Sequence, residues 1–551
     1  KVPAVVFQPP EGDVEERLAR IWSEVLNVEQ VGRDDNFFAL GGHSLKALLA
    51  ISKTRKAFDV DVGPRALFQS PTLAGFASLL TGVRRDGFES IEPAGEQDRY
   101  EVTPAQFRLW LQHELHPRSS AHNLSSAIEL SEGLESAVIH WVLSRLVERH
   151  EALRTVFERE ADAVYQRVLP PFEVELPESR WESDAELMES IRRHAVEPFD
   201  LIRGPLFRAR LLHGQDGRRV LLWCMHEIVA DGSSSVILRR EINQLIKAHH
   251  GDVAPPQAPR IQYKDFAVWQ RRQLAAENNA ARVYWHRQLS GAITALDLPF
   301  DYPLTGESNW KADVYEHRLQ ADLKTRLDDL ARSRQVTLFM LLQSALSTLL
   351  MRLTGQHDII LAVPVAGREH PDVQSTVGFF LNTILLRHRV ESERTFTDLL
   401  EQVRRTTLEG LEQQHYPFER LLEELDLPHD PNRFPVTPVM FNMLNFIDSR
   451  DSSSGPGLAR NRRFRDGKTE FEMDALDAGE DLRLRVFYRS ALFKASTIEY
   501  LVGELEVLLE QIVEDSDKAL AEYDLFGFCE VSGESYPQAL NSAYLEFMGD
   551  F

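Results

Sequence analysis

The sequence predicts a small all-α unit at the start of the chain and a larger α/β unit in two lobes after it. Residues 11–81 show only helical spacings of apolar residues, whereas helical and strand patterns mix from Tyr100 onward. A chain of 551 residues is also too long for one ordinary core and suggests two to four domains. These observations favour separate units of different class.

The small unit is expected to contain helices joined by short turns. Apolar residues recur every three or four positions over residues 15–26, and a second such stripe begins near Ser44. A third helix follows Thr72, which can serve as its N-cap, and runs to Leu80. Residues 82–100 lack apolar periodicity and contain Glu, Asp, Pro and Gly, which predicts a linker.

The large unit repeats a mixture of sheet and helix patterns. Its expected helices cover residues 137–148, 270–290, 322–353 and 396–425, and its expected strands cover residues 220–225, 358–364 and 481–488. Because both halves carry strands and helices, we expect two lobes, each with a sheet and covering helices.

Composition narrows the functional class. The net charge of −23 argues against nucleic acid or an anionic membrane as partner. The short basic run at residues 460–465 is interpreted as a solvated loop first and a partner contact second. Two cysteines, Cys224 and Cys529, exclude a disulfide framework and favour a reducing cytoplasm. The start resembles no signal peptide, and the apolar stretch at 337–350 suits a buried helix, so we expect a soluble, cytoplasmic protein. We also expect it to be a monomer.

One segment of the small unit carries chemistry. Residues 35–45 read DNFFALGGHSL, in which Gly41 and Gly42 allow unusual backbone conformations and Ser44 begins a helix. Free N–H groups and the helix dipole favour a phosphate there. The segment resembles the attachment motif of peptidyl carrier proteins, which implies a four-helix carrier with 4′-phosphopantetheine covalently bound to Ser44. The alternative is a plain N-cap after a turn, and the eleven-residue match favours the carrier.

The large unit carries an eight-residue signature at 225–232, MHEIVADG. It resembles the His-His-x-x-x-Asp-Gly signature of condensation domains in nonribosomal peptide synthetases. His226 takes the first histidine position, Asp231 and Gly232 close the motif, and Glu227 occupies the position of the second histidine. Six further segments resemble motifs of the same family in the same order, the last of them loosely: 103–110, 149–157, 263–269, 377–383, 415–419 and 430–435.

Most residues of these further segments have a structural interpretation. Residues 149–157 suit a helix end that leads into a strand, and Phe266 and Trp269 suit a buried aromatic face. Asn382 is expected to satisfy neighbouring backbone groups. Only the signature loop is assigned to chemistry.

The resemblance also implies the architecture of the large unit. Its fold should be similar to chloramphenicol acetyltransferase, with two lobes in a V and the signature loop in a tunnel between them. The expected boundaries are a carrier at 1–83, a linker at 84–99, an N-terminal lobe at 100–272, a C-terminal lobe at 273–525 and an unassigned tail at 526–551.

The implied reaction is peptide-bond formation, in which an acceptor aminoacyl amine attacks a donor thioester held on the carrier arm. Orientation of two reactants is worth effective molarities of about 10⁵–10⁸ M. A general base typically contributes about 10²–10⁴-fold. We therefore expect positioning to outweigh proton transfer.

Glu227 is the position where the chain departs from the family. Reference pKa values of about 6.5 for histidine and 4.3 for glutamate differ by about 3 kcal/mol of proton affinity. Glu227 should be the weaker base and lacks a hydrogen to donate when ionised, although it could pair with the acceptor ammonium. We expect lower activity than in a Glu227→His variant.

The other signature residues are given structural roles. His226 should support the loop, Asp231 should shape it through an ion pair with an arginine, for which Arg108 is the candidate, and Gly232 should permit the turn. The three serines that follow suit a helix start.

Two alternative functions stay open: a gating module that binds carriers but catalyses weakly, and an epimerisation domain. A heterocyclisation domain would need aspartate at position 226. Implied partners are an upstream adenylation domain, downstream carrier and adenylation domains, a phosphopantetheinyl transferase, and aminoacyl or peptidyl thioesters. The make-up also resembles siderophore assembly lines, although no residue selects that product.

Overall fold

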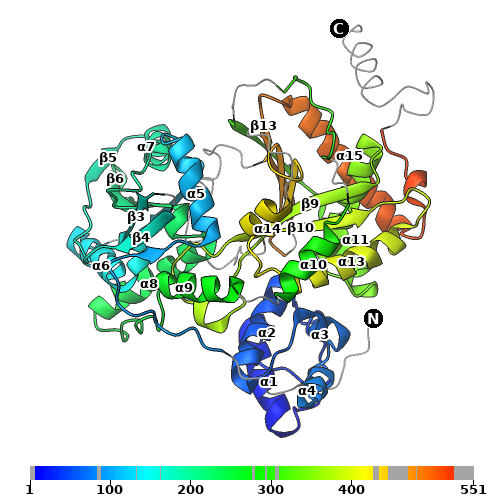
Figure 1. Ribbon diagram of the computed structural model, residues 1–551, viewed down its shortest axis with the longest axis horizontal. Coiled ribbons are helices and arrows are strands. Elements are labelled where there is room, and N and C mark those ends of the chain that lie inside the picture. The colour runs from blue at the N-terminus through cyan, green and yellow to red at the C-terminus, as the bar shows by residue number, and fades with distance from the viewer. Residues whose placement is uncertain are drawn as a thin grey trace.

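The structure is a computed structural model (Figure 1). It describes residues 7–82, 89–131, 133–161, 163–275, 279–291, 295–304, 310–425, 433–444, 469–479 and 481–526. The basic run at 460–465, Cys529, residues 430–432 and the tail beyond Phe526 lie outside this part of the chain. Among the described residues no single helix is long and apolar enough to span a membrane. The helices α11 (Ala321–Ser333) and α12 (Leu338–Thr354) pass that test together as a pair bent by 105°.

The first unit consists of four helices, α1 (Gly12–Leu26), α2 (Ser44–Phe58), α3 (Pro64–Gln69) and α4 (Leu73–Thr81). The ring of Trp22 packs against those of Phe37 and Phe76, with centroids 5.0 and 6.2 Å apart, and all three are fully buried. Thr72 caps α4 by accepting the Gly75 N–H at 3.3 Å, as predicted. The six-residue α3 is too short to show a helical period in the sequence.

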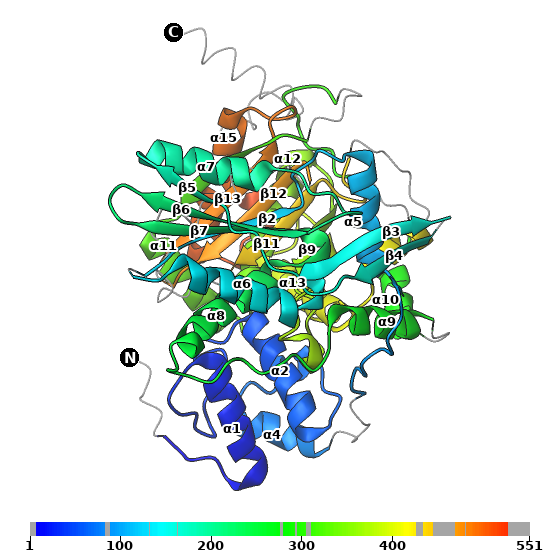
Figure 2. The ribbon, with the colours of Figure 1, turned by 90° about the vertical axis from the view of Figure 1, so that its left-hand side faces the viewer.

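The first lobe of the large unit contains two small sheets. One has the order β2-β7-β6-β5 and the other the order β1-β4-β3. Helices α6 and α8 cover one face of the four-stranded sheet, and α7 covers the other (Figure 2). The elements are β1 (Tyr100–Glu101), α5 (Pro104–Leu115), β2 (Asn123–Glu129), α6 (Ser136–Arg149), β3 (Thr155–Glu160), β4 (Ala163–Val168), β5 (Glu178–Trp181), α7 (Asp184–Val196), β6 (Phe207–Gly214), β7 (Arg219–His226), α8 (Gly232–His249) and α9 (Tyr263–Leu274).

Strand β7 explains the apolar run seen in the sequence. Leu221 and Trp223 face the core beneath α6 and α8, while Val220 and Leu222 face the core beneath α7. A strand covered on both faces needs apolar residues at every position rather than at alternate ones. The strand ends at His226, the first histidine of the signature.

The second lobe is built on one mixed sheet with the order β10-β9-β11-β12-β13-β8. Helices α12 and α13 pack on β9 and β10, and α15 packs on β13 and β8. The elements are α10 (Ala280–Gln288), β8 (Ala312–Arg318), α11 (Ala321–Ser333), α12 (Leu338–Thr354), β9 (Asp358–Val365), β10 (Asn382–Arg389), α13 (Phe396–Glu412), α14 (Phe418–Leu425), β11 (Val439–Leu444), β12 (Phe471–Asp477), β13 (Leu482–Arg489) and α15 (Ala495–Glu514).

Three predicted helices are each divided in two. The segment at 322–353 forms α11 and α12, because Gln335 adopts a left-handed conformation with φ of 55°. The segment at 396–425 forms α13 and α14, which are separated by a turn before Pro417, and the segment at 270–290 covers the end of α9 and all of α10. Apolar periodicity passes across such short breaks, so it does not reveal them.

Residues 366–381 join the two lobes. They follow β9 of the second lobe, yet Val373, Val377 and Phe379 are buried in the core of the first lobe. The Tyr263 hydroxyl donates to the Phe379 carbonyl at 2.6 Å and also lies 3.1 Å from the Thr103 hydroxyl. We call residues 366–381 the joining loop.

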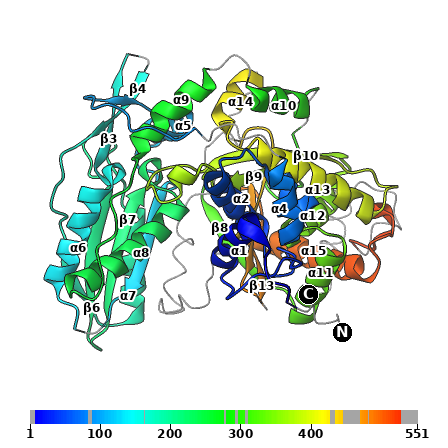
Figure 3. The same ribbon diagram turned by 90° about the horizontal axis from the view of Figure 1, so that it is seen from below.

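The helical unit docks on the large unit through α2 and α3 (Figure 1). Seen from below, it lies in front of the second lobe (Figure 3). The Gln374 amide donates to the Ser52 hydroxyl at 2.6 Å, and Lys56 lies 3.5 Å from Asp372. In the predicted linker, residues 89–99 form no helix or strand, but they are anchored, since the Ile91 N–H donates to Asp372 at 3.2 Å. Both units and the linker therefore meet on the joining loop.

Candidate active site

The signature forms a tight loop between β7 and α8. His226 ends the strand, residues 227–229 form one turn of 3-10 helix, and Asp231 is the N-cap of α8. Because β2 pairs with β7 in the register Asn123 to His226, the residues that precede β2 lie beside the loop.

Asp231 is held by Arg368 rather than by the predicted Arg108. Its two carboxylate oxygens lie 2.9 and 3.0 Å from one guanidinium nitrogen of Arg368, and both side chains are buried. Asp231 faces the joining loop, whereas Arg108 faces α14 and donates to Glu419 at 2.6 Å. The prediction of an arginine partner is confirmed, and the choice of Arg108 is wrong.

Asp231 also begins α8. It accepts the Ser234 N–H at 2.7 Å, and the Ser234 hydroxyl donates back to the same carboxylate at 2.8 Å. The Phe380 N–H donates to the other oxygen at 3.2 Å. The helix start predicted for the serines is confirmed, and the same carboxylate ties the signature to the joining loop.

Gly232 does not play its predicted part in a turn. It is the first residue of α8, and its backbone does not adopt a left-handed conformation. A Cβ placed on it would meet no atom within 4 Å. The backbone therefore does not require glycine here, and the position that a Cβ would occupy on Gly232 faces open space.

His226 is buried and held in a fixed orientation. Its Nδ1 accepts the Ile228 N–H at 3.1 Å, so the neutral ring carries its proton on Nε2. Burial, helped by the neighbouring His122 and His113, lowers the pKa of His226 well below its ordinary value. The ring of Phe199 packs edge-on against it. His226 keeps its predicted role of supporting the loop. It would do so through its contacts with Ile228 and Phe199.

Glu227 is buried and pairs with a histidine that sequence reasoning missed. Its Oε2 lies 2.8 Å from Nδ1 of His122, and its backbone N–H donates to the His122 carbonyl at 2.7 Å. His122 belongs to none of the recognised segments. Only the strand register brings it to the signature, so no local pattern could have identified it.

The other motif segments supply structure. Asn382 donates to the backbone carbonyls of Gln414 and Tyr416, each at 2.7 Å, and accepts the Phe418 N–H at 3.0 Å. It satisfies neighbouring backbone groups, as predicted. Arg149 ends α6 and binds Glu241 at 3.0 Å, also in line with the helix end expected there.

The attachment segment suits a phosphate-linked group. Ser44 is the first residue of α2, and a Cβ on Gly42 would overlap the ring of Phe37, so the turn before the helix needs glycine. Nδ1 of His43 is buried with no hydrogen-bond partner, and burial together with Lys46 lowers the pKa of His43 to about 4. A neutral imidazole, a lysine and free N–H groups at a helix start fit a phosphodiester.

The chain matches two protein families. Residues 96–529 match the condensation domain family, and residues 16–80 match the phosphopantetheine attachment site family. The chain belongs to the condensation domain family. It also contains a carrier unit for covalently attached 4′-phosphopantetheine, so the predicted succession of a helical carrier and a two-lobed condensation unit is confirmed.

The relatives of this condensation domain chain are far longer proteins. It is 34% identical to surfactin synthase subunit 1 of Bacillus subtilis (strain 168), over 95% of the chain but 14% of that protein. It is also 34% identical to tyrocidine synthase 3 of Brevibacillus parabrevis, over 95% of the chain and 8% of that protein. The chain therefore spans a small part of the curated relatives it matches.

Solved structures agree on the fold. The X-domain from teicoplanin biosynthesis superposes with a TM-score of 0.72 at 22% identity, over 80% of the chain and all of that domain. A four-domain nonribosomal peptide synthetase bound to AMP and glycine superposes with a TM-score of 0.69 at 20% identity, over 80% of the chain and 35% of that protein. At these identities the likeness concerns the fold alone.

Proposed function

We propose that this condensation domain forms a peptide bond between an acceptor aminoacyl amine and a donor acyl group held as a thioester. The observation that carries the proposal is the signature loop, which a buried Asp231–Arg368 ion pair ties to the joining loop. The open space beside Gly232 lies on the same loop.

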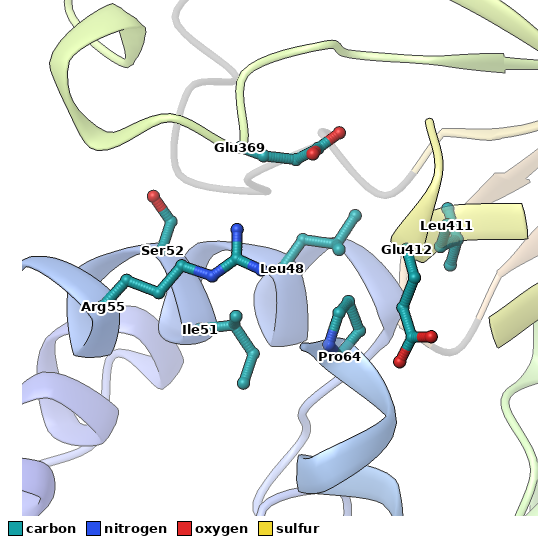
Figure 4. A pocket seen from close by; sticks show the side chains of 8 residues that line it. All are labelled: Leu48, Ile51, Ser52, Arg55, Pro64, Glu369, Leu411 and Glu412. Carbon is teal, nitrogen blue, oxygen red and sulfur yellow. The ribbon is translucent and has the colours of Figure 1, made fainter. Parts of the chain in front are cut away.

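The docked carrier supports delivery of the donor. Positions 44, 48, 51 and 55 of α2 share one helix face by their spacing. Leu48, Ile51 and Arg55 from this face line a pocket against the condensation unit (Figure 4). Glu369 of the joining loop lines the same pocket, and its neighbour Arg368 binds Asp231. The arm-bearing helix thus contacts the residue next to the group that fixes the signature.

Positioning supplies most of the rate in this proposal. A thioester is already activated, and the arm provides the thiol that holds the acyl group. Orientation of two reactants is worth effective molarities of about 10⁵–10⁸ M, whereas one general base typically raises the rate about 10²–10⁴-fold. The fixed loop and the docked carrier are the parts of this chain that orient the reactants.

The arrangement in a longer protein is also proposed. The carrier would extend to residue 83 and the linker to residue 99, with a first lobe at 100–272 and a second lobe at 273–525. Adenylation and further carrier domains would flank them, a phosphopantetheinyl transferase would load Ser44, and the chain would act as a monomer.

A gating module is the second candidate, because Glu227 is a weaker base than the family's histidine. The experiment loads Ser44 with a donor thioester, adds an acceptor aminoacyl carrier, and measures dipeptide by intact-protein mass spectrometry. We expect dipeptide from the chain, more of it from Glu227→His, and no loading of Ser44→Ala. Unchanged loading in both the parent chain and the Glu227→His variant would support gating, and inversion of the donor without transfer would indicate epimerisation.

A further inference from the structure

His122 and Glu227 form a buried pair, which we call the His122–Glu227 pair. Nδ1 of His122 lies 2.8 Å from Oε2 of Glu227, and their side chains are 14% and 7% exposed. The Glu227 N–H donates to the His122 carbonyl at 2.7 Å, so the backbone fixes the pair as well. Both residues lie where β2 and β7 meet side by side at the signature.

The pair has a defined proton arrangement. An ionised carboxylate only accepts hydrogen bonds, so the proton shared with Glu227 belongs to Nδ1 of His122. In the neutral ring the basic lone pair is then on Nε2. A carboxylate in this position fixes the tautomer and the orientation of the imidazole. A lone glutamate offers neither a nitrogen base nor a reference pKa near neutrality.

The surroundings of His122 include further titratable groups. Glu227 approaches from the signature turn, and His226 approaches from β7 with a ring centroid 6.0 Å away. His113 of α5 also packs against His226, and Arg208 of β6 acts on His226. The pKa of His226 is well below its ordinary value, so that ring is neutral, and the carboxylate of Glu227 contacts His122 directly.

Building on the proposed function, we propose that His122 is the catalytic base of this domain and that Glu227 is the positioning residue that orients it. The His122–Glu227 pair thereby takes over the role that a histidine at position 227 would fill. A histidine from outside the signature supplies the base, and the substituted signature residue supplies its carboxylate.

The step balances without a further reactant. The acceptor nitrogen forms a C–N bond to the thioester carbonyl carbon, and the C–S bond breaks with its electrons on sulfur. The nitrogen releases one proton to Nε2 of His122, and the imidazolium returns that proton to the departing sulfur. The products are an amide and a free thiol, and the Nδ1 proton stays hydrogen-bonded to Glu227 throughout.

The test separates the base from the hydrogen bond. In His122→Asn the side-chain amide occupies the place of Nδ1, so it can still donate to Glu227 while the base is lost. We expect dipeptide formation in single turnover to fall about 10²-fold. The pH profile should also lose the limb that follows imidazole ionisation. The same substitution in a Glu227→His background should change the rate less than about twofold, because the histidine introduced at position 227 then supplies the base.

A matched control is His317, whose Nε2 lies 2.7 Å from Glu506 in the second lobe. His317→Gln keeps that hydrogen bond and should leave dipeptide formation unchanged. Equal losses for His122→Asn in both backgrounds, or no loss in the Glu227 chain, would overturn the proposal while the proposed function stands. Absence of dipeptide from both the Glu227 and the Glu227→His chains would instead reject the proposed function and this proposal together.

If His122→Asn disturbs the fold, His122→Gly with added imidazole provides a second route. Recovery of the rate with imidazole in the Glu227 background supports the base assignment. A folded His122→Gly chain that regains nothing counts against it.

Discussion

Replacement of Asp231 by asparagine should loosen the signature loop from the joining loop. Asparagine keeps the size of the side chain and caps helices about as well as aspartate, so the substitution removes mainly the charge. Arg368 then stays buried without its carboxylate, and both side chains are less than a tenth exposed. Loss of one partner of a buried ion pair typically costs about 3–5 kcal/mol.

We place the loss at the lower end, about 3 kcal/mol, because Arg368 keeps other contacts. It donates to the carbonyls of Val373 and Thr376 at 2.7 Å each, and its guanidinium lies 4.3 Å from the ring centroid of Phe380. A loss of about 3 kcal/mol corresponds to roughly 10²-fold more frequent local opening, since about 1.4 kcal/mol is tenfold.

The assay is hydrogen exchange of the Ser234 and Phe380 amides, which donate to this carboxylate. Exchange reports local opening and avoids assigning one unfolding energy to a chain of several units. Glu189→Gln is the control, because its pair with Arg192 is nearly half exposed and should change exchange little. An Asp231→Asn chain with exchange close to that of the parent would refute the reasoning, as would additive losses in the Asp231→Asn, Arg368→Met double variant.

Two further predictions concern glycines and pH. Gly232→Ala should leave the unfolding midpoint unchanged or slightly raised, because its Cβ meets open space in a helix, whereas Gly378→Ala should lower the midpoint, because its Cβ would overlap the ring of Tyr263. Thermal denaturation compares the two, and a larger loss for Gly232→Ala would contradict the geometry. Burial raises the pKa of Glu369 to about 8 against the opposing charge of Arg55. Because the docked state favours the protonated acid, docking should weaken as pH rises from the ordinary glutamate pKa of about 4.5 through about 8, and Glu369→Gln should remove that dependence. Fluorescence transfer between dyes on the carrier and on α13 measures docking, with Glu189→Gln as control, and a flat profile for the parent chain would contradict the prediction.

Much of the fold follows from local patterns. Spacing alone predicts the helical stripes of the first unit and the cap at Thr72, because each helix buries one face against a small core. The apolar run at 220–225 is equally visible in the sequence, since a strand buried on both faces leaves a continuous signal. The breaks within residues 322–353 and 396–425 escape prediction, because single turns interrupt the chain without interrupting its apolar period.

The site is only partly predictable for a different reason. His226, Glu227 and Asp231 lie within six residues of one another and form one loop, so a motif can find them. His122 and Arg368 reach the same loop from positions more than 100 residues away, through strand register and through the joining loop. Such contacts depend on tertiary packing, and the sequence around each of these residues contains no pattern that predicts them. Arg108 is the wrong choice because it pairs with Glu419 instead of Asp231. The sequence does not reveal this pair, since the two residues are also far apart along the chain.

The carrier and the second lobe share one apolar cluster, in which Leu67 and Phe76 belong to the same packed set as Leu346 and Leu386. Exchanging the carrier for one from another protein would therefore require a matching interface with the condensation unit, and a suitable linker alone would not be enough. A foreign carrier would have to reproduce the α2 and α3 surface as well as a loading serine. A junction placed in residues 89–99 would cut a segment that is anchored to Asp372 and Asp265. For this chain, the transferable part is the carrier together with the condensation unit that it contacts.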